Sequence, residues 1–226
     1  MNQDKDFLGK EPVGRLLLKL ALPTVTAQII NMLYNIVDRI YIGHIPVYGA
    51  AALTGVGVTM PAIMIISAFA ALVSAGGAPR VSMLMGKGAP DSAERIIGTC
   101  TFTLCAISLA LTLIMQLFAV PILRLFGASD ATLPYALEYI SIYSLGTIFV
   151  QLSLGLNAFI TAQGFSTTSM LTVTIGAALN IVLDPLFMFV FGMGVRGAAL
   201  ATVISAWAGP VLILAVSAIQ RNMLIS

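Results

Sequence analysis

Apolar residues follow one another along this chain in six long stretches, separated by short clusters of glycine, proline and charge. Each stretch reaches about 20 mostly apolar residues, the length that a helix needs to cross a bilayer. The pattern therefore predicts an all-α integral membrane protein, a bundle of six transmembrane helices. The predicted spans are about 16–42, 49–76, 95–120, 134–161, 168–191 and 197–219.

Lysine and arginine positions predict how these spans are oriented, because cytoplasmic loops carry an excess of them. Assigning alternate sides along six spans leaves eight basic residues on one side and three on the other, namely Arg39, Arg124 and Arg196. We therefore expect a multi-pass protein of the plasma membrane, or inner membrane, with a cytoplasmic N-terminus. Residues 1–15 form the cytoplasmic N-terminal segment, 16–219 the helical lobe, and 220–226 the start of a cytoplasmic linker.

Polar residues in the first span recur at helical spacing. The steps between them are three, four and three, which places them on one helix face; they are Gln28, Asn31, Asn35 and Asp38, with Tyr34 in the same sector. The opposite face carries Val25, Ile29, Met32 and Ile36, as lipid contact requires. Amides alone can serve to join helices by hydrogen bonds, but this stripe ends in a carboxylate. Arg39 follows Asp38 and is expected to extend toward the outer interface.

A second carboxylate lies in the fifth span. Asn180 and Asp184 are four residues apart, and Pro185 follows. Carboxylates are costly within a bilayer and are functional candidates there. Helical rise places Asp38 and Asp184 in the outer half of the membrane, at a depth similar to that of Thr202 in the sixth span. Carboxylate, amide and hydroxyl oxygens suit Na⁺, or an aspartate that takes up a proton. Asn157 lies nearer the inner end.

Composition excludes several classes of protein. Hydrophobic residues make up 59% of the 226 positions and charged residues 9%, against about 25% charge in soluble domains. The net charge of +2 gives no sign of nucleic-acid binding. Cys100 and Cys105 lack the spacing of a redox or zinc motif, and His44 is the only histidine. With no catalytic set and no motif for a bound cofactor, we expect a non-enzymatic membrane protein.

Three segments resemble multidrug and toxic compound extrusion (MATE) transporters. The first-span stretch 34–44, YNIVDRIYIGH, is similar to the family's first-helix motif. The stretch 180–185, NIVLDP, together with 194–202, GVRGAALAT, resembles its helix 5–6 signature, and Gly86-Lys87-Gly88 is similar to its 2–3 loop. The resemblance covers about residues 10–220.

The resemblance implies twelve helices in two six-helix lobes that expel cationic, amphipathic, drug-like molecules in exchange for Na⁺ or H⁺. This chain is then the N-terminal lobe, and the C-terminal lobe is missing from it. The coupling-ion site falls on Asp38, Asn180, Asp184 and Thr202, with Asn157 adjoining, and the substrate cavity on Asn31 and Tyr34. Gln28 and Asn35 share the cavity-facing stripe. Pro23 and Pro185 are the expected helix kinks.

The length leaves alternatives open. The chain matches one lobe and has no internal repeat, so we expect a partial or truncated sequence, with a half-sized protein that dimerises as the alternative. Two alternative functions remain open. One is a lipid-linked oligosaccharide flippase of the same superfamily, although such flippases have a more basic cavity. The other is a non-transporting fragment.

Overall fold

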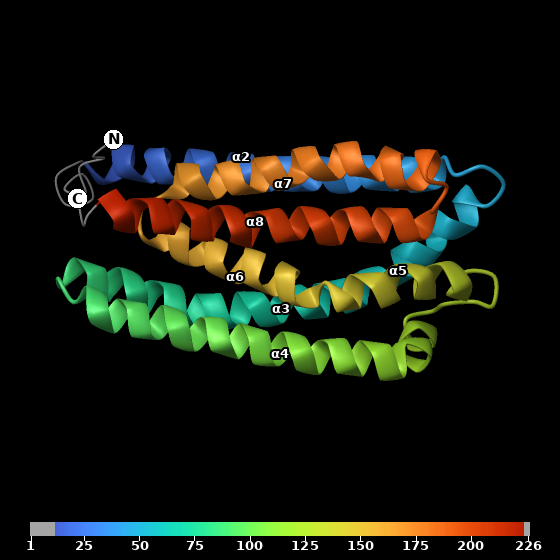
Figure 1. The fold of residues 1–226 in the computed structure, drawn as a ribbon, viewed down its shortest axis with the longest axis horizontal. Helices are drawn as coiled ribbons and strands as arrows, with labels where there is room; N and C mark the ends of the chain where they lie inside the picture. The colour runs from blue at the N-terminus through green and yellow to red at the C-terminus, as the bar shows by residue number, and fades with distance from the viewer. Residues whose placement is uncertain (1–11, 224–226) are drawn as a thin grey trace.

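The computed structural model describes residues 12–223, and the regular secondary structure over that range is all helical, which confirms the all-α class (Figure 1). The expectations for 1–11 and 224–226 fall outside the described residues. The helices are α2 (Val13–Gly43), α3 (Gly49–Gly86), α4 (Pro90–Leu125), α5 (Leu133–Leu145), α6 (Thr147–Ala162), α7 (Ser166–Pro185) and α8 (Val195–Met223), with a π-helical turn η1 (Leu186–Val190) after α7.

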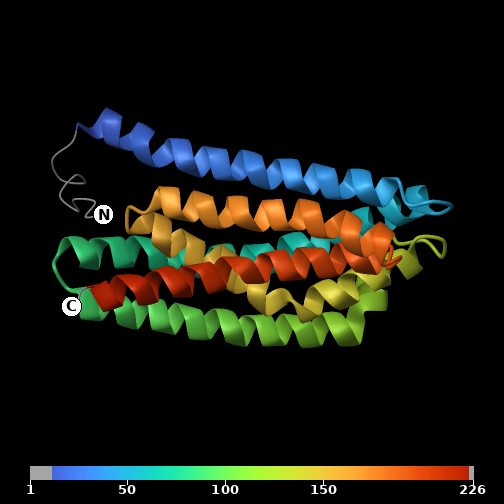
Figure 2. The same ribbon diagram turned by 45° about the horizontal axis from the view of Figure 1, so that its top comes forward.

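The helices form an elongated bundle. In Figure 1, α2, α7 and α8 lie on one side and α3 and α4 on the other, with α5 and α6 between them. Helix α2 packs mainly against α7, and far less against α3 or α8. Figure 2 shows α2 at the edge of the bundle, diverging from α7 toward its N-terminus. We call the end where α2 passes into α3 the α2–α3 end.

Length and apolarity support membrane crossing for most of these helices. Within the described residues, α2, α3, α4 and the continuous α7–η1 segment are each long and apolar enough to span a bilayer. The pair α5 and α6 counts as a fifth span that is bent by 60°. The part of α8 from Val195 to Gly209 is apolar but shorter than a full span.

The bend at Gly146 corrects the expectation of one continuous helix over 134–161. Gly146 lies against α8, where a Cβ atom would collide with Val203. Polar side chains of α4 bind backbone oxygens next to the bend: Thr112 donates to Ser144 O at 2.8 Å, and Gln116 Nε2 donates to Ser141 O at 2.8 Å. A bent helix in an apolar environment needs such donors, because water is not available to bind the freed carbonyls.

The second helix also differs from the sequence expectation. It continues beyond residue 76, where the predicted span ends, passes through Pro79 and ends at Gly86. Gly88, with φ of 69°, ends it: the Gly88 and Ala89 amides donate back to Met85 O and Leu84 O. Glycine accepts this left-handed conformation at little cost, so the chain turns into α4 two residues later.

Small residues bring α8 close to its neighbours. Ala198, Ala199 and Ala201 are fully buried, and a Cβ on Gly197 would meet the backbone of Phe187. On α2, by contrast, Val25, Ile29, Met32 and Ile36 are all exposed. The bundle therefore has a close-packed interior along α8 and an apolar outer face along α2.

Candidate coupling-ion site

Asp38 is the one buried member of the polar stripe on α2. Its side chain is 7% exposed, whereas Asn31 and Tyr34 are half-buried, and Gln28 and Asn35 are exposed. Asn35 donates from Nδ2 to Asn31 O at 2.7 Å on its own helix. Burial therefore differs among the residues of the predicted stripe. Its two exposed amides form no hydrogen bond with another helix, and its carboxylate is buried in the bundle.

Asp184 and Asn180 occupy the face of α7 that packs against the bundle. Both are buried, at 0% and 1% exposure. The Asn180 amide donates from Nδ2 to Asp184 Oδ1 at 3.2 Å. Pro185, which cannot donate a backbone hydrogen bond, marks the point where α7 gives way to the π-helical turn. The expected irregularity at Pro185 is thus a change of helix type, whereas α2 continues as helix through Pro23.

The two carboxyl groups meet across the α2–α7 contact and interact directly with each other. Three oxygens in this group have no hydrogen-bond partner: Asp38 Oδ1, Asp184 Oδ2 and Asn180 Oδ1. Buried acceptors without donors are costly, and two adjacent carboxylates repel each other when both are charged. The arrangement therefore favours a species that brings positive charge to these oxygens, either a cation or a proton.

Helix α5 adds two tyrosines that the sequence reasoning missed. Tyr139 is buried, is close enough to Asp38 to interact electrostatically, and lies within hydrogen-bonding reach of Thr202. Tyr143 stacks on Tyr139 with ring centroids 6.0 Å apart and also interacts with Tyr34. Their i, i+4 spacing in the fourth predicted span was the available signal.

The structure places the last two predicted ligands differently. Thr202 adjoins the group through Tyr139, although its own hydroxyl donates to Ala198 O at 3.0 Å. Asn157 lies apart, because its Oδ1 accepts a hydrogen bond from Thr172 at 3.1 Å. Thr172 precedes Asp184 by twelve residues, or about 18 Å along α7. The structure therefore does not bring Asn157 together with Asp38 and Asp184.

The donor set suits a hard cation better than a transition metal. Na⁺ and similar ions take carboxylate, amide and hydroxyl oxygens, which are the groups assembled by Asp38, Asp184 and Asn180. Among residues 12–223, no three His, Cys, Asp or Glu side chains come together in a metal-binding group. A site with two carboxylates is compatible with a single monovalent ion or with protons.

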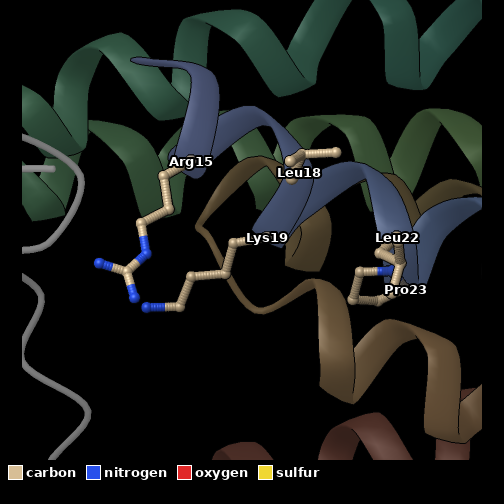
Figure 3. Close-up of a pocket in the computed structure, with 5 residues that line it drawn as sticks. All are labelled: Arg15, Leu18, Lys19, Leu22 and Pro23. Atoms are coloured by element: carbon tan, nitrogen blue, oxygen red, sulfur yellow. The ribbon is translucent and has the colours of Figure 1, made fainter. Parts of the chain in front are cut away.

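A pocket lies along the N-terminal part of α2, away from the two aspartates. Figure 3 shows Arg15 and Lys19 extending from the same side of α2, with Leu22 and Pro23 further along the helix. The pocket has a volume of about 430 Å³. Pro23 is fifteen residues from Asp38, about 22 Å along the helix, so this pocket is separate from the carboxylate pair.

Comparison with known proteins places these features in a family. The MatE family model matches residues 23–186, which include Asp38, Tyr139 and Asp184. The chain belongs to the MatE family. Its relatives are transporters rather than enzymes, and its apolar helices make it a multi-pass membrane protein.

Two curated relatives show the range of the family. The chain is 27% identical to the FAD transporter of Shewanella oneidensis over 90% of this chain and 45% of the relative. It is also 27% identical to the multidrug export protein MepA of Staphylococcus aureus, over 88% of this chain and 44% of the relative. The chain thus spans about half the length of these relatives.

Solved structures agree on the fold. An outward-facing multidrug resistance MATE transporter of the MOP superfamily matches 94% of this chain and 46% of its own, at 25% identity and a TM-score of 0.85. A MATE structure in complex with MaD3S matches the same share of this chain and 47% of its own, at 25% identity and a TM-score of 0.85. The bundle therefore corresponds to one half of a MATE-type transporter.

Proposed function

We propose that this chain is the N-terminal lobe of a cation-coupled antiporter and that it holds the coupling-ion site. The observation that carries the proposal is the group of three unpartnered buried oxygens on Asp38, Asp184 and Asn180. Na⁺ or H⁺ bound there stabilises the α2–α7 contact by relieving the repulsion between the two carboxylates. Loss of the ion leaves that contact weakened, so the ion favours one conformation of the lobe.

Transport follows if the exported molecule favours the other conformation. A ligand shifts a two-state equilibrium only by its difference in affinity for the two states. In this proposal the coupling ion selects the state in which α2 packs on α7 near Asp38. The exported molecules are amphipathic and drug-like, cationic in the class that the family resemblance implies. They bind the face of α2 that carries Asn31 and Tyr34, opposite a second lobe, while the N-terminus remains cytoplasmic.

The test uses cells that express the protein from its complete coding sequence. Asp184→Asn keeps the size of the side chain and one acceptor oxygen, and removes its charge. We expect ion-driven efflux of a fluorescent cationic dye to fall to background while the amount of protein in the membrane stays unchanged. Asp130→Asn is the matched control, because Asp130 is exposed and pairs with Arg124 outside the site. Undiminished ion-dependent efflux by Asp184→Asn would refute the proposal.

A further inference from the structure

Two polar side chains of α6 are fully buried without a complete set of hydrogen-bond partners, just beyond the bend at Gly146. They are Thr147 and Gln151, each 0% exposed. Gln151 donates from Nε2 to Ile66 O of α3 at 2.8 Å. Among the described residues, however, neither its Oε1 nor the Thr147 hydroxyl has a hydrogen-bond partner. Residues four apart on a helix share one face, so both oxygens lie on the face of α6 that packs against α3.

The bend deprives Thr147 of the partner that other threonines of this chain use. Thr101 and Thr202 each donate from their hydroxyl to the backbone oxygen four residues earlier, at 2.8 Å and 3.0 Å. For Thr147 that oxygen is Tyr143 O, which belongs to α5 on the other side of the 60° bend. Tyr143 O accepts instead from the Gly146 amide at 3.0 Å. The Thr147 hydroxyl is therefore left to a partner outside its own helix.

The chemistry of the two groups favours water over a cation. A buried polar group without a partner has lost its hydration without replacement, so a small polar ligand is favoured at this position. Neither α3 nor α6 carries an aspartate or glutamate, and a buried cation without a neutralising carboxylate is costly. Water can donate, as Gln151 Oε1 requires, and can also accept from the Thr147 hydroxyl. The site thus differs from the carboxylate pair of Asp38 and Asp184.

The position of these groups is deep within the bundle. Ile66, whose carbonyl binds Gln151, lies seventeen residues from the start of α3, about 25 Å along that helix. Helix α6 packs against both α3 and α8, and Figure 1 shows it in the interior of the bundle. In membrane helices, ordered waters are one means by which polar groups freed at a helix break are satisfied again. A water at this depth therefore has a structural reason.

We propose that Thr147 and Gln151 hold a buried water molecule that stabilises the bend between α5 and α6. The water accepts a hydrogen bond from the Thr147 hydroxyl and donates one to Gln151 Oε1, while the Gln151 amide remains on Ile66 O. It replaces the bond that Thr147 would form within a straight helix. Because the bend sets the direction of α5, which carries Tyr139, the water helps to maintain one wall of the candidate coupling-ion site without contacting the ion.

The first test detects the water by X-ray radiolytic labelling of the protein, purified in detergent from its complete coding sequence. Irradiation converts a bound water into a hydroxyl radical, which oxidises the nearest side chain even where bulk solvent does not reach. We expect labelling at Ile66, which is fully buried. The double variant Thr147→Val, Gln151→Leu should bring it to background. Leu123, equally buried on α4, is the control and should stay at background in both proteins.

The second test uses the sign of a change in stability. Thr147→Val keeps the shape of the side chain and removes the hydroxyl. With a water bound, the variant loses a hydrogen bond, so we expect the apparent melting temperature to fall by a few degrees. Without a water, removal of an unpartnered buried hydroxyl raises it. Thr99→Val is the matched control and should change it little, because Thr99 is exposed and donates only to Arg95 O of its own helix.

Three outcomes would overturn the proposal: no labelling of Ile66, labelling that survives the double variant, or a higher melting temperature for Thr147→Val. A rise in melting temperature with Na⁺ that persists in Asp184→Asn but is lost in the double variant would assign these oxygens to a cation instead. The measurements need no ion gradient and no substrate. Failure of the Asp184→Asn efflux test would therefore refute ion coupling and leave the water site standing.

Discussion

Asn180 donates a hydrogen bond from its side-chain amide to Oδ1 of Asp184 at 3.2 Å, across one turn of α7. This bond fixes one oxygen of the carboxylate and leaves Oδ2 without a partner beside Asp38. Asn180 therefore positions Asp184 as well as contributing its own amide oxygen. A carboxylate held in this way presents one free oxygen to an ion without having to reorganise.

Replacing Asn180 tests this positioning. Asn180→Ala removes the donor to Asp184 and one of the unpartnered oxygens, so we expect ion-driven efflux to fall by about tenfold or more, the effect of losing a hydrogen bond to a charged group. Asn157→Ala is the matched control. Asn157, on α6, bonds to Thr172, which lies about three turns of α7 away from Asp184. Its efflux should stay within about twofold of the original. Equal losses in the two variants would contradict the assignment.

The bend at Gly146 gives a prediction for stability. A Cβ at this position collides with Val203 of α8, and such overpacking typically costs about 1–3 kcal/mol. We expect Gly146→Ala to lower the apparent melting temperature in detergent, and Val203→Ala in the same protein to restore part of the loss. Gly98→Ala on α4 should cause no loss, since nothing lies within 4 Å of its added carbon. An unchanged melting temperature for Gly146→Ala would contradict this prediction, because it would show that α8 accommodates the added carbon without loss of stability.

Orientation across the membrane can be tested with single cysteines. The turn at Lys87 and the loop at Ser129 lie at opposite ends of the bundle, in the α3–α4 and α4–α5 connections. In a Cys100→Ala, Cys105→Ala background, a membrane-impermeant maleimide should label Ser129→Cys in intact cells. It should label Lys87→Cys only after the cells are opened. The reverse pattern would place the N-terminus outside.

The fold and the candidate site were predictable to different extents. Apolar stretch length alone predicts membrane-crossing helices, because backbone groups in a bilayer must be satisfied within a helix or a closed barrel. The cost of burying a carboxylate singled out Asp38 and Asp184, and helical spacing joined Asn180 to Asp184. These inferences depend on local rules that every membrane helix obeys, so they needed no knowledge of which helices pack together.

Packing between helices decided the remainder. Tyr139 belongs to the site only because α5 packs beside α8, and Asn157 lies apart because its partner is Thr172. Arg39 donates a hydrogen bond to the sulfur of Met60 on α3, a contact that the sequence did not indicate. The sequence by itself determined the helices and the buried charges, through periodicity and desolvation. Only the tertiary structure decided which side chains meet, because contacts between residues far apart in sequence depend on how whole helices cross.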